Sequence, residues 1–225
     1  MDVFLVPAGA DRHELYCEVA GEAPAEEAEV TRSKGRGLMR RFREIVAAAE
    51  RERHQPAPAP PSGWGRRFGR WLLRHVAEAI AEQRLLWHLR HERQAALVHP
   101  DDITETQARA VMRAMLARDR DRHRFWLAVD GAVAAITGPL FFFVPGPNLV
   151  AYFFIFRFVG HYLAWRGARQ GLDAVVWHTR GSGPLAEIRR ALRLDGAERD
   201  RRVRDAASRL RLQHLAAFVR RTAAP

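Results

Sequence analysis

The sequence predicts a mainly α, helical membrane-associated protein with a central apolar αα-hairpin, a short N-terminal β-hairpin and amphipathic flanking helices. Apolar residues are concentrated between Phe125 and Trp165, whereas the segments on either side carry them at three- and four-residue steps. Two short β-leaning runs stand near the N-terminus. With 48% apolar residues in 225, the chain has enough apolar surface to form a buried core.

The charge of the chain gives information on its binding partners, and it does not determine the fold. The 37 basic and 26 acidic residues give a formal charge of +11, which favours polyanionic surroundings such as phospholipid head groups or nucleic acid. Lys34 is the single lysine, so much of this charge reflects a general use of arginine. The single cysteine, Cys17, excludes an internal disulfide framework and any site that needs several cysteines.

Residues 1–20 predict the β-hairpin, because the runs Val3–Pro7 and Glu14–Val19 flank a turn-forming segment. Residues 21–62 read as a flexible acidic and proline-rich linker that contains one helix over 38–53. The prolines that follow this helix lack amide donors, so they end it.

Residues 63–124 predict an amphipathic helical region. A long helix is expected from Trp64 to about Val98, ended by Pro100. A second helix begins at the sequence Thr104-Glu-Thr-Gln107, which fits a capping box.

Residues 125–166 predict the apolar hairpin. Phe125 to Val144 has one charge, Asp130, and a helix of twenty residues reaches roughly 30 Å, the thickness of the hydrocarbon core. Pro145 to Asn148 reverses the chain, and the second arm, 149–165, contains Arg157 and His161. Residues 167–225 follow as a basic C-terminal helical region.

The hairpin has two physical interpretations, a buried pair of helices in a soluble domain or a membrane-inserted pair. Arginines lie outside both arms, at 118–124 and 166–180, and the turn carries no charge. This distribution favours insertion with both termini on the cytoplasmic side.

Asp130, Arg157 and His161 stand out because a charge inside a membrane costs a few kcal/mol, so such residues are paired or functional. Helix rise brings Arg157 within reach of Asp130, and His161 lies one turn further on the same face. Two readings remain open: a neutralising structural pair with His161 at the interface, or a trio that relays protons.

No motif of an enzyme is present, because phosphate-cradling loops, a nucleophile elbow and a dinucleotide fingerprint are all missing. We therefore expect no catalytic residues and no cofactor. His88 and His91 share a helix face, but a zinc site needs four converging ligands, so no metal is expected.

Several segments resemble the mitochondrial potassium–proton exchange-related family and its bacterial relatives. They are Phe143–Asn148, Tyr152–Arg157, Gly160–Ala168 and the opening Phe4–Pro7. The resemblance implies a largely helical, membrane-associated protein linked to cation–proton exchange, located in a bacterial inner membrane. The positions that match as motif are Pro145, Pro147, Asn148, Arg157 and His161. Together with Asp130, they are the candidates for an ion or proton path.

Two functional hypotheses follow, a component or regulator of potassium–proton exchange and a membrane-anchored helical scaffold that binds anionic lipid or a protein partner. At most two spans cannot wall an ion pathway, so an exchanger needs a homo-oligomer or other membrane subunits. Membrane lipids are expected partners. Nucleic acid is not, because no recognised fold or aromatic platform accompanies the charge.

Overall fold

The computed structural model describes residues 1–9, 12–18, 85–142 and 149–223. The chain divides into two compact units. Unit 1 contains residues 1–18, 85–126 and 162–225, and unit 2 contains residues 19–84 and 127–161.

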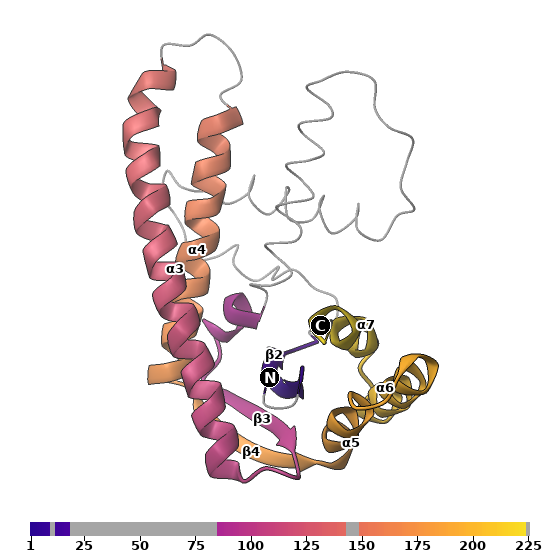
Figure 1. The fold of residues 1–225 in the computed structure, drawn as a ribbon. Coiled ribbons are helices and arrows are strands. Elements are labelled where there is room, and N and C mark those ends of the chain that lie inside the picture. Colours follow the sequence, from indigo (N-terminus) through magenta and orange to yellow (C-terminus); the bar gives the residue numbers. More distant parts are fainter. Residues whose placement is uncertain (10–11, 19–84, 143–148, 224–225) are drawn as a thin grey trace. The chain divides into compact units, whose positions relative to one another are not determined.

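Unit 1 is organised around a four-stranded sheet with the order β2-β1-β3-β4. The paired strands β3 and β4 lie side by side in Figure 1. Its strands are β1 (Asp2–Pro7), β2 (His13–Tyr16), β3 (Gln94–Pro100) and β4 (Val176–Ser182). β1 and β2 pair antiparallel, which confirms the predicted N-terminal hairpin, whereas β1–β3 and β3–β4 are parallel. Leu97 lies opposite both Val3 and Thr179, at the centre of the three parallel strands.

The inner strands β1 and β3 are buried on both faces. In β1, Val3 and Leu5 contribute to one apolar cluster, and Phe4 and Val6 contribute to another on the opposite face. Successive side chains of a strand point to opposite faces, so an uninterrupted apolar run fits a sheet that is covered on both sides.

Helices cover both faces of the sheet. The first cluster combines residues 85–89, which are helical, with the unit 1 parts of α3 (Glu105–Phe142) and α4 (Leu149–Asp173). The second combines α5 (Gly183–Ala191), α6 (Gly196–Leu210) and α7 (Leu215–Thr222). The described part of unit 1 is therefore a three-layer α/β/α arrangement.

Local signals explain where several helices begin. The capping box before α3 is confirmed, because the Gln107 amide donates to Thr104 Oγ1 and the Thr104 amide donates to Gln107 Oε1. Pro184 stands in the first turn of α5. Before α7, the amides of Gln213 and His214 donate to the carboxylate of Glu18.

The predicted fold class, mainly α, is wrong, because unit 1 contains the sheet. β3 occupies the residues that were predicted to end a long helix at Val98, and β4 lies within residues 167–225, which were predicted to be helical. Four consecutive apolar residues, Ala95 to Val98, match the doubly buried strand of a parallel sheet, whereas the helical period seen further upstream does not extend through them.

The predicted transmembrane hairpin is also contradicted. Both arms are helical, as α3 and α4, but no helix in the described ranges is long and apolar enough to span a membrane. The first arm continues a helix whose preceding residues 118–124 are charged or polar throughout, and the arm itself contains Asp130. The predicted linker with its helix over 38–53 lies outside the described residues.

Two glycines allow α4 to approach residues 85–89 closely. A Cβ at Gly167 would lie 1.7 Å from the carbonyl oxygen of Leu86, and a Cβ at Gly171 would lie 2.4 Å from Leu89 Cδ2. The next turn is held by Trp177, whose indole Nε1 donates to the Gly171 carbonyl at 2.8 Å. These glycines are needed for space, because a side chain at 167 would meet backbone atoms that cannot rotate away.

We predict that Gly167→Ala destabilises the protein by about 2–4 kcal/mol, because the new methyl group forces two backbones apart. An exposed helical glycine would behave in the opposite way, since alanine is favoured there by about 1 kcal/mol. The measurement is the free energy of unfolding in urea. Gly181→Ala is the control, because its Cβ would meet no atom nearer than 3.6 Å and it should change stability by less than about 1 kcal/mol. A rise in stability for Gly167→Ala would show that this close approach does not exist.

Candidate functional site

Asp130 is a buried acid in the apolar part of α3. Only 1% of the residue is exposed, and it lies in unit 2. A buried carboxylate is costly unless opposite charges and hydrogen bonds stabilise it. Its partners therefore decide what the site can do.

Those partners come from α4. Arg157 Nε donates a hydrogen bond to Asp130 Oδ2 at 3.3 Å, and His161 Nε2 lies 3.6 Å from the same oxygen. Arg157 and His161 are four residues apart, so one turn of α4 presents both to α3. We call these three residues the Asp130 cluster. The predicted pairing of Asp130 with Arg157 is confirmed, and His161 joins them.

The surroundings of the cluster differ from one side chain to the next. The side chains of Asp130 and His161 are 2% and 13% exposed, whereas that of Arg157 is 34% exposed. A Cβ at Gly131 would lie 3.2 Å from a ring carbon of Phe158, so these two residues pack closely beside the cluster. The carboxylate is thus enclosed while the guanidinium retains access to water.

The remaining predicted motif positions cannot be placed against this cluster. Pro145, Pro147 and Asn148 lie outside the described residues. The Asp130 cluster is therefore the part of the predicted ion or proton path that the structure brings together.

The chemistry of the cluster is that of a proton-binding group held in a low-dielectric setting. Arginine keeps its charge at all physiological pH values, whereas histidine changes charge near neutral pH. With a neutral imidazole, the carboxylate and the guanidinium balance one another. A protonated His161 would place a second positive charge beside the same carboxylate oxygen and give the cluster a net charge of +1.

A second polar cluster, in unit 1, was not predicted. Arg189 Nη1 lies 3.3 Å from Asp102 Oδ2, and Arg189 Nη2 lies 2.7 Å from His13 Nε2. His13 pairs with Pro7 at the end of β1, and Asp102 follows the end of β3, so this cluster lies at the carboxyl edge of the parallel strands. The three residues are distant in sequence and meet only through the sheet, so no local pattern could have indicated them. Among the described residues, no three His, Cys, Asp or Glu side chains form an arrangement that could hold a metal ion.

The described fold and site define an α/β protein that carries a buried, charge-paired acid between two helices. The chain belongs to the mitochondrial K+–H+ exchange-related family, whose pattern matches residues 3–175. This match confirms the resemblance found in the sequence. Comparisons with curated proteins and with solved structures found no match. The family description links the chain to mitochondria and to potassium–proton exchange by name, and it does not support a location in a bacterial inner membrane.

We predict that Asp130 and Arg157 are energetically coupled. Arg157→Gln should cost about 3 kcal/mol, because it leaves a buried carboxylate without its main partner. Adding Asp130→Asn should recover part of that loss, which gives a coupling energy of about 1–3 kcal/mol in a double-mutant cycle measured by urea unfolding.

The control cycle uses Arg169 and Asp173, also an arginine–aspartate pair and located on α4, with their charges 3.6 Å apart and both side chains more than half exposed. Their coupling should stay below about 0.5 kcal/mol. Equal coupling in the two cycles would mean that burial gives the Asp130 pair no special strength.

Proposed function

We propose that this protein is a component or regulator of potassium–proton exchange, and that the Asp130 cluster is its proton-binding element. The observation that carries the proposal is the position of His161 Nε2, 3.6 Å from the carboxylate oxygen that also accepts from Arg157. Membership of the exchange-related family supports the same reading.

Proton binding at this position would change the forces between two helices. In the unprotonated state, Arg157 alone balances Asp130 across the contact of α3 and α4 in unit 2. In the protonated state, His161 also attracts the carboxylate, so the contact becomes stronger and the cluster gains one positive charge. A regulator that senses protons needs such a coupling between charge and helix packing.

The proposed role is that of a subunit or regulator acting with other chains. An ion pathway must be walled by several helices, and every backbone group along it must be satisfied. We therefore propose that the protein acts as a homo-oligomer or with membrane subunits that contribute the pathway.

Removing His161 should abolish the pH response of the exchange. In membrane vesicles from cells that lack the endogenous protein, we expect the wild-type chain to change the rate of potassium-driven proton flux, read with a pH-sensitive dye, with a dependence on pH between about 6 and 8. His161→Gln should give a flux rate that no longer changes over this range.

His178→Gln is the matched control, because His178 lies exposed on β4 in the other unit, and its removal should leave the profile of the wild type. Vesicles with and without the protein that exchange equally fast would refute the proposed function. A wild-type pH profile in His161→Gln would instead show that the exchange does not depend on proton binding by this cluster.

A second candidate function, a scaffold bound to the surface of anionic membranes, is favoured by exposed aromatic residues of unit 1. Phe125 and Trp126 are 62% and 37% exposed, and their rings meet edge-on at 5.6 Å. On α4, Tyr162 is 40% exposed and its ring lies 6.1 Å from that of Trp165. Aromatic rings beside arginines are typical of the interface between lipid and water.

Binding to such surfaces should depend on both the aromatic rings and the lipid charge. We expect co-flotation with vesicles that contain phosphatidylserine, and several-fold less with pure phosphatidylcholine, because surface-exposed arginines gain about 1 kcal/mol each near anionic lipid. Phe125→Ser with Trp126→Ser should reduce flotation several-fold. Val176→Ser is the control, because it removes a 55% exposed apolar side chain from β4 and leaves the aromatic rings of α3 and α4 intact. Equal flotation with both lipid compositions would argue against this scaffold role.

A further inference from the structure

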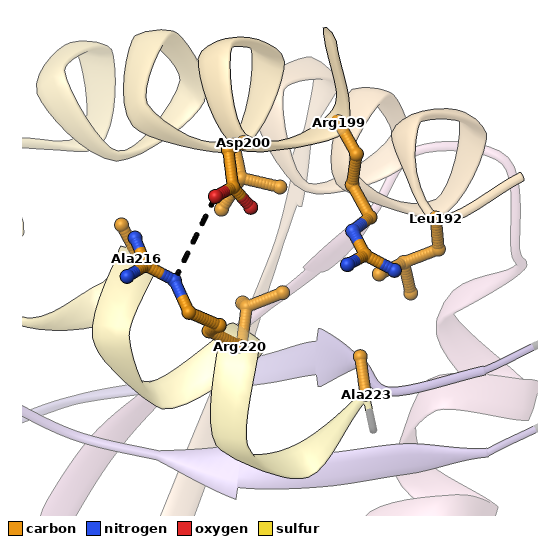
Figure 2. A pocket seen from close by; sticks show the side chains of 8 residues that line it. Leu192, Arg199, Asp200, Ala216, Arg220 and Ala223 are labelled. Atoms are coloured by element: carbon orange, nitrogen blue, oxygen red, sulfur yellow. Dashed lines mark ion pairs between the residues drawn. The ribbon is translucent and has the colours of Figure 1, made fainter. Parts of the chain in front are cut away.

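A pocket of about 140 Å³ lies among the C-terminal helices of unit 1 (Figure 2). Its lining comes from α6, α7 and the residues that follow α5 and α7. The lining residues are Leu192, Arg199, Asp200, Val203, Ala216, Val219, Arg220 and Ala223. All of them lie beyond residue 175, where the family match ends, so the family name says nothing about this pocket.

The apolar side of the pocket is continuous with the core of unit 1. Val203 and Val219 are 4% and 2% exposed and belong to the cluster that covers the second face of the sheet. Ala216 and Ala223 pack against that cluster, and their short side chains leave the space open. A compact apolar group that enters the pocket therefore exchanges water for contacts with the core.

The polar side of the pocket carries one net positive charge. Arg220 Nε lies 3.9 Å from Asp200 Oδ2, so these two residues form an ion pair on one side (Figure 2). Arg199 extends from α6 on the other side, toward Leu192. Arg199 makes no hydrogen bond or ion pair with any residue that the structure describes, unlike Arg201 and Arg202 on the same helix, which pair with Glu198.

We propose that this pocket binds a small monocarboxylate with a compact apolar group. The carboxylate would pair with Arg199, since a guanidinium fork matches its two oxygens, and the apolar group would rest on Val203 and Val219. A cavity of about 150 Å³ is known to accept a benzene ring, so the volume here suits a ring or a short branched chain. Asp200 disfavours ligands that carry several negative charges.

Benzoate is the probe that tests this site. We expect saturable binding of benzoate to the full chain, with a dissociation constant on the order of 0.1–1 mM, followed by ligand-observed NMR. Arg199→Gln should weaken binding by at least about tenfold, because it removes a charge-assisted hydrogen bond. Ala223→Leu should also abolish binding, because the larger side chain fills the pocket.

The control is Arg204→Gln, which removes the same charge from α6 at an exposed position that does not line the pocket. It should bind benzoate as the wild type does, and benzyl alcohol should bind the wild type at least tenfold more weakly than benzoate. Thermal melting of each variant verifies that it is folded. Absence of benzoate binding to the wild type, or equal affinities of the wild type and Arg199→Gln, would overturn the proposal. Equal losses in Arg199→Gln and Arg204→Gln would also overturn it, because they would indicate attraction to the overall charge only.

Discussion

The burial of the two inner strands on both faces is the constraint on which unit 1 depends. β1 and β3 direct apolar side chains to both faces of the sheet, so each face needs a layer of helices to exclude water. The segment between β3 and β4 supplies one layer through α3 and α4, and the segment after β4 supplies the other. The tight packing at Gly167 follows from the same need, because three helical segments must share one face of a narrow sheet.

The stability of the Asp130 cluster depends on the cost of burying charge and on the attraction between its charged side chains. Burying the carboxylate of Asp130 costs several kcal/mol, and the attraction of the partly exposed Arg157 guanidinium offsets this cost only when the geometry is good. Such a pair adds little stability compared with apolar side chains of the same size, but it opposes any register of α3 and α4 that separates Asp130 from Arg157. The energetic benefit of the cluster is therefore specificity of packing, to which the contact of His161 with the same carboxylate oxygen contributes.

The sequence predicted those features whose signal is local. The Thr104 capping box is local, and Asp130 is conspicuous as the one charge in an apolar run. β3 escaped prediction because an inner strand of a parallel sheet, buried on both faces, lacks the alternation that marks a half-buried strand. β4 escaped prediction because this edge strand has only two apolar residues, Val176 and Trp177, and its partner β3 lies many residues away in the sequence. The contact between Asp102, Arg189 and His13 depends on those same strands, so it was hidden for the same reason. The membrane prediction rested on the small number of charges in the two arms, and it is contradicted because no helix in the described ranges is long and apolar enough to span a membrane.

The match to the family ends at residue 175, one residue before β4 begins, so β4 and α5 to α7 lie outside it. Phe4, Val6 and Val98 lie within the matched residues, but the helices that cover them, α5 to α7, lie beyond it. The matched part of the chain thus depends on the unmatched part for the second face of its core. Any role that the family name implies must be sought in the matched helices and their buried acid. Val203 and Val219 line the pocket and also pack in the apolar cluster that contains Phe4 and Val98. A ligand held among α5 to α7 would therefore contact the cluster that covers the matched strands β1 and β3 on the face of the sheet opposite α3 and α4.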